Sequence, residues 1–136
     1  MPLLREHIRL YVDAPLAAGV GLTLPREQAH YLRNVMRRKE GDMIGLFNGR
    51  DGEWRAVIQT LAKQACTATP QELIQPQTRT PDVWLICALI KRTRLGIIVE
   101  KAAELGVREI HPVLTEYTNA PRANTGRLAA IAIEAA

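Results

Sequence analysis

The chain has 136 residues, of which 47% are hydrophobic and 24% charged, and its formal net charge is +4. This length and composition allow one buried core or two small ones, which excludes a chain that is mainly disordered. The surplus of 18 Lys and Arg over 14 Asp and Glu permits nucleic-acid binding without requiring it. No stretch has the apolar length of a membrane span, and Cys66 and Cys87 show no metal-binding spacing. We therefore expect a reduced, cytoplasmic protein without a metal site.

The first half of the chain is typical of a small β-barrel or β-sandwich with one helix. Strands are predicted at residues 8–12, 43–47 and 53–60, and weaker ones at 65–69 and 73–74. Asn48-Gly49 and Asp51-Gly52 predict a hairpin turn between 43–47 and 53–60. Pro25 and Glu27 mark the start of a helix that runs to about Arg38. Its predicted apolar stripe consists of Ala29, Leu32, Val35 and Met36.

One face of this predicted helix is basic. His30, Arg33 and Arg37 fall at i, i+3 and i+7, so they are expected to lie side by side. Cations at that spacing repel one another unless an anion lies among them, and a nucleic-acid phosphate is the natural anion. A solvated basic face without a ligand is the alternative, and the pattern alone does not separate the two interpretations.

The second half of the chain has the pattern of a βαβ unit. The polar segment 75–81 is predicted to be a linker between domains at 1–74 and 82–136. Apolar runs at 83–90 and 110–114 predict two parallel strands joined by a helix within 91–107. The buried stripe of that helix is predicted to be Leu95, Ile98, Val99, Ala102 and Leu105, with Gly106 as its cap.

A last helix is predicted after Thr125, which is a candidate N-cap. The chain stops at Ala136 without a C-terminal capping signal, and two parallel strands make an incomplete layer. We therefore expect the second domain to continue beyond residue 136.

Three cations, Lys91, Arg92 and Arg94, directly follow the first strand of the βαβ unit. Ligands of open α/β sheets bind at the carboxyl ends of strands, so these side chains are expected where an anionic substrate would be met. They could also be solvated charges. Positive charge at a helix start is slightly unfavourable, however, which favours a role in binding.

Short motifs lie along nearly the whole chain, at Arg9–Val12, His30–Arg37, Gly41-Asp42, Phe47–Gly49, Ala88–Lys91, Glu100–Val107, Ile110–Pro112, Arg127 and Glu134-Ala135. Their order and spacing are more specific than any one of them. Together they resemble the RsmE family, enzymes that methylate N3 of a uridine in 16S ribosomal RNA. The chain departs from the family at Ala103, where Thr is usual, and at Tyr117-Thr118, where Arg-Ser is common. Gly96 replaces a more polar helix former at a cost of about 1 kcal/mol.

The resemblance implies a PUA-like β-barrel that binds RNA, followed by the first part of an α/β SPOUT domain with a trefoil knot. It implies S-adenosylmethionine as the cofactor, bound in knot loops expected beyond residue 136. It also implies 16S ribosomal RNA or the small ribosomal subunit as partner, and a homodimer for the full-length protein. Residues 1–136 are therefore expected to supply RNA-binding surface and scaffold, and to be inactive alone.

Six side chains are expected to contact RNA: Arg9, His30, Arg33, Arg37, Lys91 and Arg94. Arginine suits this role because its planar fork binds phosphate through two hydrogen bonds. No residue is predicted to be catalytic, and Lys101 with Glu104 is expected to be an ordinary surface ion pair. The alternative function is a complete, non-enzymatic RNA-binding or ribosome-associated module. A metabolic α/β enzyme has little support, since the sequence has no glycine-rich phosphate loop and no nucleophile elbow.

Overall fold

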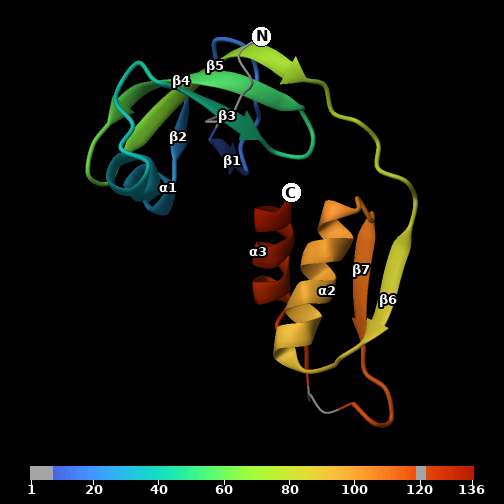
Figure 1. Ribbon diagram of the computed structural model, residues 1–136. Coiled ribbons are helices and arrows are strands. Elements are labelled where there is room, and N and C mark those ends of the chain that lie inside the picture. Colours follow the sequence, from blue (N-terminus) through green and yellow to red (C-terminus); the bar gives the residue numbers. More distant parts are fainter. Residues whose placement is uncertain (1–7, 119–121) are drawn as a thin grey trace. The chain divides into compact units, whose positions relative to one another are not determined.

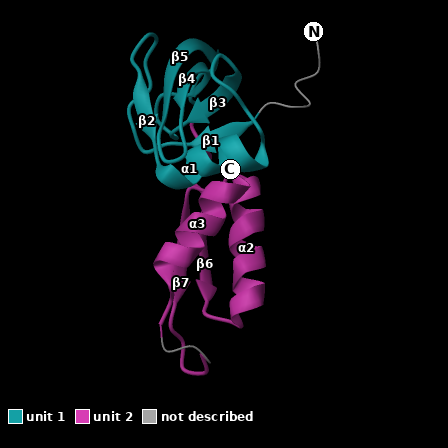
Figure 2. Ribbon diagram, turned by 90° about the vertical axis from the view of Figure 1, so that its left-hand side faces the viewer, with its two compact units in different colours: residues 1–78 teal, residues 79–136 magenta. Residues whose placement is uncertain are grey.

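The computed structural model describes residues 8–118 and 122–136. The chain divides into two compact units, residues 1–78 and 79–136 (Figure 2). The division falls inside the segment 75–81 that was expected to be a linker. None of the helices in the described ranges has the length and apolar character needed to cross a bilayer.

The first unit is built on one curved five-stranded sheet with the order β1-β3-β4-β5-β2 (Figure 1). Its strands are β1 (Arg9–Tyr11), β2 (Leu22–Leu24), β3 (Met43–Phe47), β4 (Glu53–Leu61) and β5 (Cys66–Gln75). β1 pairs with β3 in parallel, and the other neighbours are antiparallel. The strands predicted at 8–12, 43–47 and 53–60 are confirmed, and so is the hairpin turn that joins β3 to β4.

Two strand predictions differ from the structure. The segments 65–69 and 73–74 belong to one strand, β5, which continues through Pro70. Proline has no N–H to donate, and the β4–β5 register shifts beside it, between Arg55 and Ala56. β2 was not predicted, because a strand of three residues is too short to show alternation.

The core of the first unit is almost wholly aliphatic. Its buried side chains are Ile8, Val12, Leu16, Leu24, Ala29, Leu32, Ile44, Leu46, Ala56, Ile58, Cys66 and Ala68. Trp54 packs against this core, and its indole N–H donates to the carbonyl oxygen of Asp51 at 2.9 Å.

A polar network joins the β3–β4 turn to the loop that follows β1. The buried Asn48 donates from Nδ2 to the Ala14 carbonyl oxygen at 2.9 Å and to Oδ2 of Asp51 at 2.6 Å. The same carboxylate oxygen accepts from the Leu16 N–H at 2.9 Å. The Leu16 and Asn48 hydrogen bonds lower the pKa of Asp51 below its usual value, the Leu16 bond having the larger effect. The turn is therefore tied to the core through an ionised carboxylate.

The helix that follows β2 in the first unit changes type along its length. α1 (Arg26–His30) leads into a π-helical turn, η1 (Tyr31–Val35), where the Met36 N–H donates to the Tyr31 carbonyl oxygen at 2.9 Å. The helix therefore ends at Val35, not near Arg38 as predicted. Ala29 and Leu32 are buried as expected, but Val35 is 60% exposed because the wider π turn rotates it off the inner face.

The second unit contains β6 (Trp84–Ala88), α2 (Arg92–Glu104), β7 (Glu109–Val113) and α3 (Thr125–Ala135). β6 and β7 are parallel, which confirms the predicted βαβ unit. Both helices lie on one face of the two strands (Figure 1). The buried residues there are Leu89, Leu95, Val99, Ala102 and Leu128.

The opposite face of the β6–β7 pair exposes apolar side chains. Trp84 and Ile86 are 55% and 64% exposed, and the Trp84 ring stacks on His111 with centroids 5.2 Å apart. The Trp84 indole N–H donates to Oδ1 of Asp82 at 3.0 Å.

The helix ends of this unit test three finer predictions. Gly106 has a φ of 79° and ends α2 as predicted, but Leu105 is 83% exposed because it follows the last helical turn. Asn124, not Thr125, caps α3, and its side-chain oxygen accepts the Arg127 N–H at 3.1 Å. The expected pair of Lys101 and Glu104 is confirmed, with 3.1 Å between Nζ and Oε2.

Candidate nucleic-acid interface

A solvent-open groove of about 640 Å³ runs along the helix of the first unit, and we call it the α1 groove. One wall comes from the helix and the other from the turn between β4 and β5. Its lining side chains are Arg26, Glu27, His30, Arg33, Asn34, Lys63 and Gln64. Two predicted RNA contacts, His30 and Arg33, are therefore brought together as the sequence indicated.

The α1 groove is cationic. Arg26, Arg33 and Lys63 face a single carboxylate, that of Glu27. Among the described residues, no ion pair involves any of these three cations. Their donors are thus available to an anion from solution, and a strand of phosphates is the anion that an open cationic groove best accommodates.

His30 also contributes to the α1 groove as a hydrogen-bonding group. Its Nδ1 lies 2.8 Å from Nδ2 of Asn34, one helical turn further on. When the amide donates to Nδ1, the ring hydrogen is on Nε2, which remains available as a donor. His30 can therefore donate a hydrogen bond to an anion without carrying a charge.

The sequence reasoning missed Arg26 and Lys63. Arg26 could have been found, because it precedes His30 by four residues and Arg33 by seven, which is helical spacing on one face. Lys63 had no comparable signal. It lies in the turn after β4, and only the folded sheet brings that turn opposite the helix.

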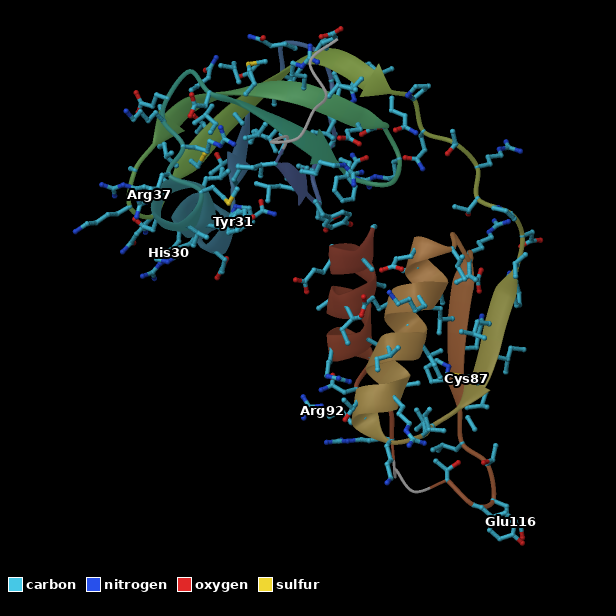
Figure 3. The ribbon with its side chains drawn as sticks, in the orientation of Figure 1. His30, Tyr31, Arg37, Cys87, Arg92 and Glu116 are labelled. Carbon is cyan, nitrogen blue, oxygen red and sulfur yellow. The ribbon has the colours of Figure 1, made fainter. Side chains whose placement is uncertain are left out.

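Arg37 does not belong to the predicted basic face. It follows the π-helical turn and has a left-handed φ of 51°, which is uncommon for a residue other than glycine. It is exposed and does not line the α1 groove. Figure 3 shows Arg37 with His30 and Tyr31 at the end of the first unit that carries α1.

Arg9 is partly engaged inside the protein. Its Nε donates to Oε1 of Glu53 at 3.0 Å, and its guanidinium carbon lies 4.7 Å from the centre of the Phe47 ring. Both partners come from strands of the sheet, so Arg9 helps to fix β1 against them. It does not line the α1 groove.

The second unit has its own cationic surface where β6 gives way to α2. Lys91 and Arg94 are both exposed, and Lys91 occupies the N-cap position of α2. A pocket of about 210 Å³ lies beside them, but it is Arg92 that lines it, together with Arg122 and Arg127. We call this the three-arginine pocket.

The α1 groove lies in a stretch, residues 24–71, that matches the family model of the RNA methyltransferase PUA domain. Residues 76–136 match the model of the RNA methyltransferase domain. The ribosomal RNA small subunit methyltransferase E of Rickettsia conorii is 30% identical over 131 residues, which are 96% of this chain and 54% of that protein. The chain belongs to the RsmE family.

Solved structures agree with the RsmE assignment. The RsmE protein of Neisseria gonorrhoeae, solved with S-adenosyl methionine, has a TM-score of 0.81 and 26% identity, over 96% of this chain and 55% of that one. A putative methyltransferase of Legionella pneumophila, solved with the same cofactor, has a TM-score of 0.83 and 26% identity, over 96% and 57%. The chain therefore spans about half the length of the RsmE relatives that it matches.

Proposed function

We propose that this chain is the RNA-binding part of a methyltransferase that uses S-adenosylmethionine to modify N3 of a uridine in 16S ribosomal RNA. The observation that carries the proposal is the α1 groove. Its three cations form no ion pair with any residue that the structure describes, and they lie in the residues matched by an RNA methyltransferase PUA model. Arg26, Arg33 and Lys63 are assigned to phosphate groups. His30 is assigned to a phosphate or sugar oxygen.

Four further residues remain proposed RNA contacts outside the α1 groove. Arg37 and Arg9 belong to the first unit, and Arg9 would keep its pair with Glu53 while binding. Lys91 and Arg94 stand at the start of α2, where they are assigned to RNA phosphates or uracil oxygens.

The reaction requires that N3 of the target uracil be accessible and lose its proton. Uracil N3 carries a proton on the Watson–Crick edge, so the base must be unpaired before it is modified. Loss of that proton leaves an anion, which nearby cations and hydrogen-bond donors stabilise. We assign no proton transfer to any residue of this chain.

Two of the pockets described above are poorly suited to the cofactor. S-adenosylmethionine carries a sulfonium cation, which the α1 groove and the three-arginine pocket repel. A third groove of about 310 Å³, between α2, β7 and α3, is mainly apolar, with Arg108 and Thr125 as its polar lining residues. The cofactor site is proposed to lie beyond residue 136, as the family resemblance implies. The homodimer of the full-length protein, and the small ribosomal subunit as partner, are proposed from the family resemblance.

The test is methyl transfer from labelled cofactor to 16S ribosomal RNA, with the full-length protein and with this chain alone. The full-length protein is expected to produce N3-methyluridine, which blocks base pairing and stops reverse transcription at the modified position. This chain alone is expected to bind the RNA and to transfer no methyl group. A product methylated at another atom would refute the N3 assignment, and transfer by the chain alone would refute its scaffold role.

A further inference from the structure

The three-arginine pocket lies where the starts of α2 and α3 meet. Arg92 begins α2, Arg122 precedes α3, and Arg127 lies in the first turns of α3. Figure 3 shows Arg92 at this end of the second unit. Asn124 is the other polar lining residue, and its side chain is engaged in capping α3. The remaining lining is apolar, so the three guanidinium groups dominate the chemistry of the pocket.

The positive charge of this pocket is not neutralised by any carboxylate in the described part of the chain. No carboxylate of the described residues lines the pocket or forms an ion pair with any of the three arginines. The helix starts add further positive potential. Like charges gathered against an apolar wall repel one another, and an anion between them would remove that repulsion.

The guanidinium of Arg127 lies close to the backbone of α2 at Gly96, which is evidence of its position independent of the charge pattern. A Cβ at residue 96 would lie 3.1 Å from Nη2 of Arg127, which is tighter than an ordinary contact, so a side chain there would push the guanidinium outward by a few tenths of an ångström. In this position Nη2 donates a long hydrogen bond, 3.5 Å, to the carbonyl oxygen of Arg92. A glycine inside a helix costs about 1 kcal/mol relative to alanine. Glycine therefore makes α2 less stable than alanine would, but it leaves room for the Arg127 guanidinium beside the helix.

We propose that Arg92, Arg122 and Arg127 bind a backbone phosphate of the RNA, as a second anion site on the second unit. The proposal rests on the proposed function of the chain as an RNA-binding module. Guanidinium forks match phosphate oxygens, which accept two hydrogen bonds from one arginine. The pocket of about 210 Å³ is smaller than the roughly 300 Å³ that whole small-molecule ligands need, so it suits a single anionic group.

Two phosphate sites on separate units have a consequence for affinity. The α1 groove and the three-arginine pocket are joined by the linker, so binding of one site raises the effective concentration of RNA at the other. Loss of the pocket is therefore expected to weaken binding by the whole chain, not only by the second unit.

The test compares RNA binding by the 136-residue chain and by the double variant Arg92→Gln with Arg122→Gln, across a range of salt concentrations. We expect about tenfold weaker binding at low salt, and a log–log salt slope that is smaller in magnitude by about one. The double variant Arg50→Gln with Arg79→Gln is the matched control, since it removes the same number of charges from exposed arginines outside the pocket. An equal loss in the control would mean that only net charge matters, and would overturn the proposal.

Gly96→Ala separates the pocket from general folding effects. Its added methyl group is expected to displace the flexible end of Arg127 and so weaken RNA binding, without a loss of thermal stability, because alanine favours the helix. Unchanged affinity in both Gly96→Ala and the double variant would refute the site.

A last comparison distinguishes the source of the phosphate. If the double variant loses thermal stabilisation by inorganic phosphate but keeps its RNA affinity, the pocket binds a free anion and the RNA assignment is wrong. If RNA binding depends on Arg33 but not on the pocket, only this inference fails. If the unmodified chain does not bind RNA, the proposed function fails as well.

Discussion

Replacing Arg33 by alanine tests the α1 groove most directly. Arg33 is exposed in η1 and forms no ion pair among the described residues, while its neighbour Leu32 supplies the buried contact of the same turn. The substitution therefore removes one groove cation and leaves the core intact. Each phosphate contact with a single-stranded nucleic acid contributes about 0.7 to the slope of log affinity against log salt. Arg33→Ala should therefore reduce the slope by about 0.7. The factor by which affinity falls between roughly 50 and 200 mM salt should be smaller by about 2.6-fold.

The assay is fluorescence anisotropy of a labelled single-stranded RNA, titrated at several salt concentrations. Arg50→Ala is the matched control, because Arg50 is an exposed arginine of the same unit that does not line the α1 groove. The variant should bind about tenfold more weakly at low salt, and the control should resemble the unmodified chain. An unchanged slope in Arg33→Ala would refute the reasoning and would mean that Arg33 belongs to a solvated basic face without a ligand.

Three further predictions concern stability, and chemical denaturation measures each of them. Ile58→Ala should lower the free energy of unfolding by about 3 kcal/mol, because Ile58 is only 1% exposed in the first core; a loss below about 1 kcal/mol would contradict that packing. Gly106→Ala should cost about 1 kcal/mol, since φ is 79° and the new methyl group meets nothing within 4 Å. The control Gly126→Ala, inside α3, should be neutral or stabilising. The pKa of Asp51 is lowered from its usual 3.8. The ionised carboxylate should therefore stabilise the fold above pH 3.8, and this contribution should disappear as the pH falls through the lowered pKa of the folded state. Asp51→Asn should therefore flatten the acid side of the stability profile, and an identical profile in the variant would show that the Leu16 and Asn48 hydrogen bonds do not stabilise the folded state.

The strands and helices that the sequence predicted well are those whose signals are local. The β3–β4 hairpin follows from Asn48-Gly49 and Asp51-Gly52, whose glycines adopt positive φ at residues 49 and 52. The βαβ unit follows from two apolar runs around an amphipathic helix. Each of these patterns is complete within a short stretch of chain, so no knowledge of distant residues was needed.

The predictions that failed depend on tertiary context. Periodicity assumed an α-helix through Val35, whereas a π turn widens the helix and rotates that side chain outward. Separate strands were predicted at 65–69 and 73–74, but the β4–β5 register shift beside Pro70 lets β5 continue as one strand. Leu105 fitted the helical stripe and yet lies past the last turn of α2.

The candidate site was predictable in part for the same reason. His30 and Arg33 share a helix, so their neighbourhood was visible in the sequence. Lys63 reaches the α1 groove through the fold of the sheet, and Arg122 and Arg127 reach Arg92 through the packing of α3 on α2. Contacts between segments that are distant in the sequence leave no periodic pattern in it.

The two tryptophans of the chain provide one optical reporter for each unit. Trp54 packs against the first core, whereas Trp84 lies on the open face of the β6–β7 pair against His111. Their emission spectra should differ, because the Trp54 indole is partly buried whereas Trp84 is 55% exposed. Single-tryptophan variants, Trp54→Phe and Trp84→Phe, would then follow the melting of each unit separately. Coincident transitions would indicate that the two units unfold as one cooperative system, and separate transitions would indicate two independent ones.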